Sequence, residues 1–210
     1  MTRLSSKTLG AASGAVPVDT RSRILQAAQR LFRKRGYHAT GLNDILKLAQ
    51  APKGSMYHHF PGGKEAIAVC VIESITSALL ALFAQSRARS TAAMLRQAGE
   101  QLVIVAEKTQ FEICALYSAF AAERKSSPLL GQAVTTAYGQ MLDALQARMM
   151  QEGMSARVAQ EKAQLAVAML EGGSLLAQAR LDAALFRAAV KQAALICAVA
   201  APARAVNQSA

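Results

Sequence analysis

The chain has 210 residues and a formal net charge of +11 at pH 7, from 24 Lys and Arg against 13 Asp and Glu. Hydrophobic residues make up 52% of the sequence and charged residues 18%, a balance that excludes an intrinsically disordered chain. Trp is absent, aromatic residues are 5%, and Ala, Leu, Gln and Arg are abundant, which favours helices over a large sheet. The composition therefore argues against an all-β fold and against a disulfide-rich fold.

Particular residues exclude two further classes. The three cysteines, Cys70, Cys114 and Cys197, are odd in number and far apart, as is typical of buried thiols in a reducing compartment and not of a disulfide scaffold. The longest apolar stretch, residues 66–84, is interrupted by Glu73 and by hydroxyl side chains, which favours an amphipathic helix over a membrane span. We expect a cytoplasmic protein with no membrane partner.

The positive charge is concentrated near the N-terminus. Residues 1–64 contain eleven basic and two acidic side chains, a net charge of +9, whereas residues 65–210 contain thirteen basic and eleven acidic side chains, a net charge of +2. A basic module of this kind favours a polyanionic partner such as nucleic acid. The sequence predicts a flexible basic arm over residues 1–18, a DNA-binding module over 19–64 and a helical body over 65–210.

Helix signals follow one another quickly in the basic module. Asp19 can cap a first helix, whose apolar residues recur at helical spacing up to Gly36. Three basic residues precede this glycine, as expected at a helix C-terminus. Thr40 is a candidate N-cap for a second helix.

A third, short helix is expected to begin at Pro52, because proline is tolerated in the first helical turn, and to end at His59. A fourth helix is expected near Lys64. Two short helices joined by a tight turn and packed on a longer first helix form the helix-turn-helix arrangement, whose second short helix can enter a major groove.

The third helix carries groups suited to DNA. Lys53 and Ser55 can donate hydrogen bonds to base edges or phosphates, and Gly54 has no side chain to hold the backbone away from a groove. Tyr57 offers a hydroxyl to a phosphate and its ring to a thymine methyl group. Lys64 combines an ammonium group with the free N–H groups of a helix start, which favours a phosphate.

The other residues of this helix have a different role. Met56 and Phe60 are predicted to face inward and hold the helix against the module. His58 and His59 are adjacent, so their side chains diverge on a helix and cannot easily chelate one metal. We expect one histidine to face the DNA backbone, and we expect no metal and no cofactor.

Further helices are predicted in the body over residues 91–108, 112–124, 128–152, 156–179 and 182–200. The body contains no set of nucleophile, base and acid, no glycine-rich phosphate loop and no metal-ligand spacing, so we do not expect an enzyme. Methionine and aromatic side chains cluster in its first part, which suits an apolar ligand pocket as well as an ordinary core. The candidate pocket residues are Phe83, Met94, Phe111, Cys114, Tyr117, Phe120, Tyr138, Met141 and Met169.

The basic module resembles the DNA-binding domain of the TetR family of bacterial repressors. The matching residues, in order, are Arg23 to Phe32, Gly36-Tyr37, Thr40, Ile45, Pro52 to Phe60 and Lys64-Glu65. The Pro61-Gly62-Gly63 junction is more similar to the LmrA/YxaF-type branch than to the family at large. Leu46 stands where the family usually has valine or alanine, a conservative change.

The resemblance implies an all-α fold, with three DNA-binding helices in front of a larger helical body. It also implies a ligand-responsive repressor that binds a palindromic operator as a homodimer and is released by a small inducer. Carried over by position, Thr40, Tyr57 and Lys64 would hold phosphates, while Lys53, Gly54, Ser55 and His58 would approach the bases or the nearby backbone. The last two helices would form the dimer interface, and their candidate residues are Ala166, Met169, Gly173, Ala177, Leu185 and Ala189. Two alternatives stay open at this point: a helical architectural DNA-binding protein without an inducer, and a helical enzyme with a basic N-terminal module.

Overall fold

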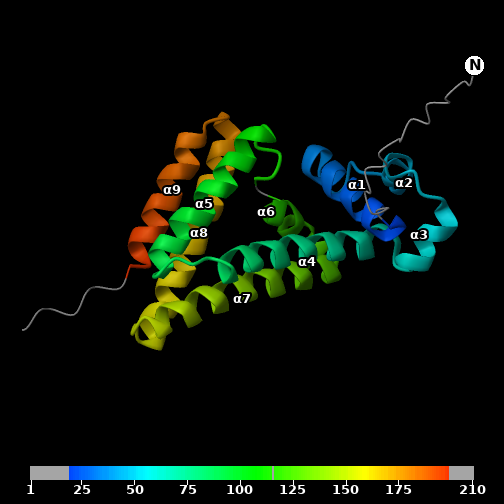
Figure 1. Cartoon of the computed structure of the whole chain (residues 1–210). Helices are drawn as coiled ribbons and strands as arrows, with labels where there is room; N and C mark the ends of the chain where they lie inside the picture. Colours follow the sequence, from blue (N-terminus) through cyan, green and yellow to red (C-terminus); the bar gives the residue numbers. More distant parts are fainter. Residues whose placement is uncertain (1–18, 115, 199–210) are drawn as a thin grey trace, which may run out of the picture.

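A computed structural model describes residues 19–114 and 116–198, and within these ranges every regular element is a helix (Figure 1). The predicted all-α fold is therefore confirmed. The predicted basic arm over residues 1–18 lies outside the described residues. The helices are α1 (Thr20–Arg35), α2 (Leu42–Ala49), α3 (Lys53–His59), α4 (Gly63–Ala84), α5 (Thr91–Lys108), α6 (Leu116–Ala121), the 3-10 helix η1 (Ala122–Lys125), α7 (Pro128–Gln151), α8 (Ala156–Arg180) and α9 (Ala183–Ile196).

Helix α1 begins and ends where the sequence predicts. The Asp19 carboxylate accepts a hydrogen bond of 2.7 Å from the Ser22 N–H, which satisfies one of the free donors of the first turn. Gly36 follows the helix at φ +75°, a conformation that favours glycine, and its N–H donates to the Phe32 carbonyl.

The start of α2 differs from the prediction. The N-cap is Gly41, without a side-chain hydrogen bond, and Thr40 is not the cap. The Thr40 hydroxyl instead donates to the Gly36 carbonyl at 2.7 Å, which closes the loop between α1 and α2. Helix α2 ends at Gln50, which has the left-handed conformation, and the turn leads through Pro52 into α3.

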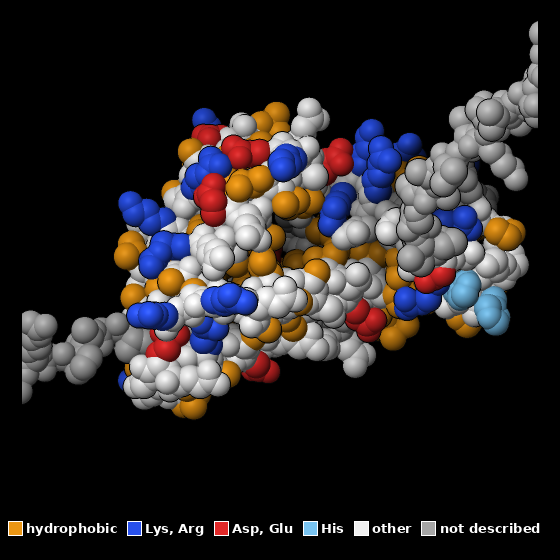
Figure 2. All heavy atoms as spheres, in the orientation of Figure 1, with side chains coloured by type: hydrophobic (Ala, Val, Ile, Leu, Met, Phe, Trp, Pro, Cys, Tyr) orange, Lys and Arg blue, Asp and Glu red, His pale blue; other side chains and the backbone are white. Residues whose placement is uncertain are grey.

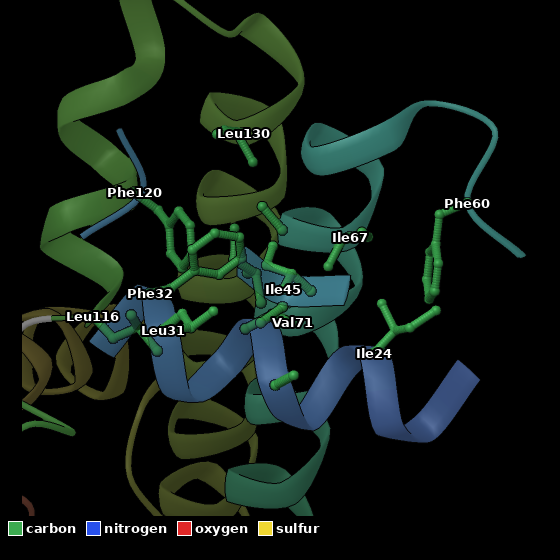
Figure 3. Close-up of a cluster of buried hydrophobic side chains, with 14 of the residues drawn as sticks. Ile24, Leu31, Phe32, Ile45, Phe60, Ile67, Val71, Leu116, Phe120 and Leu130 are labelled. Atoms are coloured by element: carbon green, nitrogen blue, oxygen red, sulfur yellow. The ribbon is translucent and has the colours of Figure 1, made fainter. Parts of the chain in front are cut away.

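The core of the N-terminal module continues into the body. Figure 3 shows Phe32 of α1 facing Phe120 of α6, with Ile67 and Val71 of α4 nearby. The two phenyl rings have centroids 5.6 Å apart and planes at 85°, the edge-to-face arrangement that aromatic pairs prefer. The predicted boundary at residue 64 falls in the first turn of α4. The module is thus packed directly on α4 and α6.

Helix α4 is long and apolar enough to cross a membrane by length and composition alone, and no other helix in the described residues is. Its apolar side chains are used inside the protein. Ile67, Ala68, Val71 and Ile72 are buried in the core that α4 shares with α1 and α7. This packing accounts for part of the apolar character of the helix.

The body is built from α4, α5, α7, α8 and α9, with α9 held between α5 and α8 (Figure 1). Small residues allow the close approach of these helices. A Cβ placed on Gly173 of α8 would lie 2.2 Å from the Cβ of Ala189 on α9, and one placed on Gly99 of α5 would lie 2.4 Å from a methyl group of Val190. Both glycines are required by packing within one chain.

The predicted helix over residues 112–124 is only partly present. A turn follows α5, in which Gln110 and Phe111 have positive φ angles of 49° and 62°, and the Phe111 N–H donates to the Ala106 carbonyl. Helix α6 begins only at Leu116, and η1 replaces its last turn. The other body helices lie within a few residues of their predicted bounds.

Candidate nucleic-acid interface and ligand cavity

Helix α3 presents a polar face to solvent and an apolar face to the module. Met56 is fully buried and Phe60 is 2% exposed, so the predicted inward side is confirmed. Tyr57 is 46% exposed although it is a large aromatic residue, and Lys53 and His58 are also exposed. The two faces of a helix of only seven residues are therefore clearly separated.

Gly54 lies in the exposed first turn of α3. It does not have a positive φ, and a Cβ placed on it would meet no atom within 4 Å. Neither backbone conformation nor packing within the chain therefore requires glycine at this position. A close approach by a partner such as a DNA groove would give a physical reason for glycine here.

This observation gives a prediction. Gly54→Ala should raise the free energy of unfolding by about 0.5–1 kcal/mol, because alanine is the better helix former. If α3 enters the groove as the family resemblance implies, the same variant should weaken binding to operator DNA, because the added methyl group would lie between the helix and the groove. Urea denaturation and a gel shift on one preparation measure both effects. Unchanged or tighter DNA binding would contradict the placement of Gly54 at the groove.

The predicted phosphate ligands Thr40 and Lys64 make contacts inside the protein. Thr40 is fully buried, so its side chain is not available to a phosphate in this structure. The Lys64 ammonium donates to the carbonyls of Tyr37 and Thr40, both at 3.1 Å, and lies 4.2 Å from the centroid of the Tyr37 ring. Lys64 thereby ties the start of α4 to the loop before α2. An ammonium group has three donors, so one stays available to a phosphate.

The imidazole rings of His58 and His59 have centroids 5.2 Å apart and planes at 68° to each other. Within the part of the chain that the structure describes, no three His, Cys, Asp or Glu side chains form a group that could hold a metal ion.

The body contains a cavity of about 550 Å³, a size typical of small-molecule sites. Its walls come from α4, α5, α7 and α8, from the segment around Tyr117, from Phe186 of α9, and from α1, which contributes Gln29 and Arg33. Figure 2 shows a hollow with hydrophobic walls on this face, above α4. The cavity therefore lies against α1, the first helix of the N-terminal module.

Four of the nine predicted pocket residues line this cavity: Phe83, Cys114, Tyr117 and Met141. The other five do not. Phe120 packs on Phe32 in the core of the module, Met94 and Met169 belong to the core between α5, α7 and α8, Phe111 packs beside α9, and Tyr138 contacts Tyr117. The sequence could not separate these five residues from the lining residues, because burial in a core and exposure to a cavity give the same apolar pattern.

Sequence reasoning missed several lining residues. Apolar ones include Leu79, Leu82 and Leu170, and polar ones include Arg33 and Glu171. The leucines carry no signal that separates them from other core leucines. A carboxylate that interrupts an apolar helix face was the one signal that could have identified Glu171.

Tyr117 and Glu171, two polar residues of the cavity wall, have polar partners behind them. The Thr76 and Tyr117 hydroxyls are 2.9 Å apart, and the Tyr117 and Tyr138 rings have centroids 5.6 Å apart. Burial raises the pKa of Glu171, whereas a hydrogen bond from Tyr138 partly offsets this shift. Burial also raises the pKa of the Cys114 thiol to about 11, so this cysteine is protonated at neutral pH and is a poor nucleophile.

The predicted dimer residues lie mostly inside the chain. Ala166 and Ala177 are fully buried, and Gly173 is buried against Ala189. Met169 and Leu185 are partly buried against the same cores. The small side chains of these residues do mark a close packing of helices. This packing joins α8 to α9 of the same chain and is not a contact between two chains. The outer faces of these helices instead expose large apolar residues, namely Leu165, Leu175, Leu176, Leu181 and Leu195.

A helix-turn-helix module with a polar third helix, joined to a helical body with a cavity, defines a DNA-binding transcription regulator. The family model of bacterial regulatory proteins of the tetR family matches residues 24–69, and that of the LmrA/YxaF-like transcriptional regulator C-terminal domain matches residues 91–192. The HTH-type transcriptional regulator LmrA of Bacillus subtilis is 35% identical over 164 residues, which cover 75% of this chain and 86% of that protein. The chain belongs to the TetR family, in its LmrA/YxaF-like branch.

A second curated relative and two solved structures are also similar to this chain. The HTH-type transcriptional repressor NemR of Escherichia coli is 44% identical over 55 residues, 26% of this chain and 27% of that protein. The crystal structure of its reduced form superposes with a TM-score of 0.70 at 25% identity, covering 89% of this chain and all of that one. A TetR regulator structure from Legionella pneumophila has a TM-score of 0.76 at 21% identity, covering 85% and 97% of the two chains.

Proposed function

We propose that this regulator is a cytoplasmic repressor that binds a palindromic operator as a homodimer and is released when a small molecule fills its cavity. One observation carries the proposal: α1 lines the cavity with Gln29 and Arg33 and also packs on α3, the helix that we propose faces DNA. A ligand that contacts α1 can therefore favour one position of the module over another.

The packing of α1 supports a mechanical link between the two sites. Ile24 and Phe32 belong to the same buried core as Met56 of α3. Gln29 and Arg33 lie on the same helix, at the edge of the cavity. Because a packed core shifts as a unit, displacement of α1 by a ligand moves α3 with it.

Dimerisation fits the outer faces of α8 and α9. Leu165 and Leu175 are ten residues apart and Gly172 lies between them, a spacing that places all three on one face of α8. Leu181 and Leu195 extend the apolar surface to α9. A two-fold axis through this surface would bury these leucines and place the two α3 helices in successive major grooves, about 34 Å apart.

The dimer surface is tested by placing a positive charge on it. Leu175→Arg should convert the protein to a monomer and weaken operator binding, because a buried guanidinium without a partner is costly. Leu129→Arg is the matched control, since Leu129 is 56% exposed on α7, outside this surface, and Leu175 is 50% exposed. Light scattering after gel filtration measures the mass of each variant. If the Leu175→Arg protein is still dimeric, the dimer interface lies on another surface.

The repressor proposal itself is tested by selecting DNA sites from random duplexes. We expect a two-fold symmetric site to be enriched, and binding to it should fall steeply with salt, because several phosphates are neutralised. The protein should bind the enriched site much more tightly than a duplex with the same bases in scrambled order. Salt-sensitive binding with little sequence preference would instead indicate an architectural protein.

The cavity gives little support to catalysis. Among its described lining residues, the thiol of Cys114 is protonated at neutral pH, and no histidine is present to act as a base. A binding role for the cavity is therefore the simpler account.

A further inference from the structure

We propose that the cavity recognises lipophilic cations, and that Glu171 is the residue that selects the positive charge. The proposal rests on the proposed function, since it concerns the ligand that fills the cavity of the regulator. It follows from the surroundings of one carboxylate and from the shape and polarity of the wall around it.

Glu171 lies in the middle of α8 and lines the cavity together with apolar residues such as Leu79, Leu82 and Leu170. Its side chain is partly buried, and this burial raises the pKa of its carboxylate. A carboxylate in such a place is usually offset by a cation of the protein. Among the ion pairs of the described residues, none includes Glu171.

Arg33 is the candidate for a cation that could pair with Glu171, but its charge is supported by another carboxylate. Arg33 is the only Lys or Arg among the described residues that line the cavity, and the carboxylate that supports its charge is Glu112. The Tyr138 hydroxyl donates to Glu171 and stabilises its charged form, but a hydroxyl brings no positive charge. The negative charge of Glu171 is therefore left without a counter-charge at the cavity wall.

An aromatic ring stands beside this carboxylate. Tyr117 lines the cavity, its hydroxyl is held by Thr76 and its ring is braced by Tyr138. An aromatic ring next to a carboxylate adds to the attraction for a cation. The remaining lining is mostly apolar, so it suits the hydrocarbon groups of the same ligand. A neutral ligand would leave the charge unbalanced, and an anion would be repelled.

Two ions of the same shape and opposite charge test the proposal directly: tetraphenylphosphonium and tetraphenylborate. Calorimetry on the full chain without DNA should show binding of the phosphonium and much weaker binding of the borate. Glu171→Gln keeps the size of the side chain and an acceptor for Tyr138, and it should weaken phosphonium binding by about tenfold or more, as removal of a desolvated charge partner implies. Glu107→Gln is the control, because Glu107 is exposed and pairs with Arg187 outside the cavity.

The pH dependence of phosphonium affinity is a second test. If Glu171 had only a structural role, its titration would not change this affinity. Tetraphenylphosphonium has no titrating group, so its affinity should fall as the pH is lowered through the raised pKa of Glu171. The titratable or charged groups that face this carboxylate are Tyr138, Tyr117, Cys114 and, across the cavity, Arg33. Burial keeps the two tyrosines and the thiol neutral at neutral pH. Tyr138→Phe removes a hydrogen bond to the carboxylate and should move the loss of affinity to higher pH.

The outcomes separate this proposal from that of a repressor. An absence of phosphonium binding, equal binding of both ions, or an unchanged affinity in Glu171→Gln would overturn the assignment of the cavity to cations. Tighter binding of the borate would point to Arg33 as the anchor. Operator binding, measured by gel shift on the same preparation, reports on the repressor alone, so each proposal can fail without the other.

Discussion

Phe32→Ala should lower the free energy of unfolding by about 3–5 kcal/mol, because it leaves a cavity in a core that is closed on every side. Phe32 is 1% exposed and its ring packs edge to face on Phe120, which is also 1% exposed. This loss is a large part of the stability of an ordinary domain, about 5–15 kcal/mol. Urea denaturation followed by circular dichroism measures it.

The same pair of residues shows whether the module and the body unfold together. Phe120→Ala and the double variant complete a mutant cycle with Phe32→Ala. We expect the two losses to be non-additive by about 0.5–1.5 kcal/mol, since each ring is the partner of the other. Additive losses, or separate unfolding transitions for the two parts, would contradict a shared core and with it the link from cavity to DNA.

Tyr57→Ala should reduce operator affinity by roughly thirtyfold while the protein stays folded. A lost hydrogen bond to a phosphate costs about 1 kcal/mol, and the substitution enters both subunits of the proposed dimer, so the total is about 2 kcal/mol. Tyr57 is exposed and contributes little to the core, although Lys53 lies 6.0 Å from its ring centroid. Fluorescence anisotropy of a labelled duplex measures the affinity, and a thermal melt checks the fold.

Lys64→Ala is an informative comparison. Lys64 holds the carbonyls of Tyr37 and Thr40, so its removal should lower both operator affinity and the melting temperature. Loss of affinity in Tyr57→Ala with an unchanged melting temperature therefore distinguishes direct contact from loop support. If the Tyr57→Ala protein binds the operator as tightly as the wild type, α3 does not contact the DNA as proposed.

The sequence predicted those features that depend on neighbouring residues. The cap at Asp19, the stop at Gly36 and the inward face of Met56 and Phe60 follow from helical spacing and local hydrogen bonds, and the structure confirms them. Thr40 shows the limit of local rules. Its hydroxyl has a carbonyl four residues earlier within reach, at Gly36, and this contact displaces the expected cap by one residue.

Contacts between distant segments had no local signal. His38 pairs with Glu123 and Ser127 donates to Glu65, and both contacts join the module or the start of α4 to the segment around η1. The small residues of α8 indicated close packing but could not tell a helix of the same chain from one of a partner. Glu171 was similarly ambiguous, because only the arrangement of several helices turns an acidic residue into the wall of a cavity.

Hydrogen exchange with and without the selected operator duplex tests the central claim most directly. The account predicts that DNA protects the amides of residues 53–60 and the first turn of α4, while α5, α7 and the outer faces of α8 and α9 exchange at unchanged rates at a fixed dimer concentration. Protection confined to the body, with residues 53–60 exchanging as in the free protein, would contradict the account.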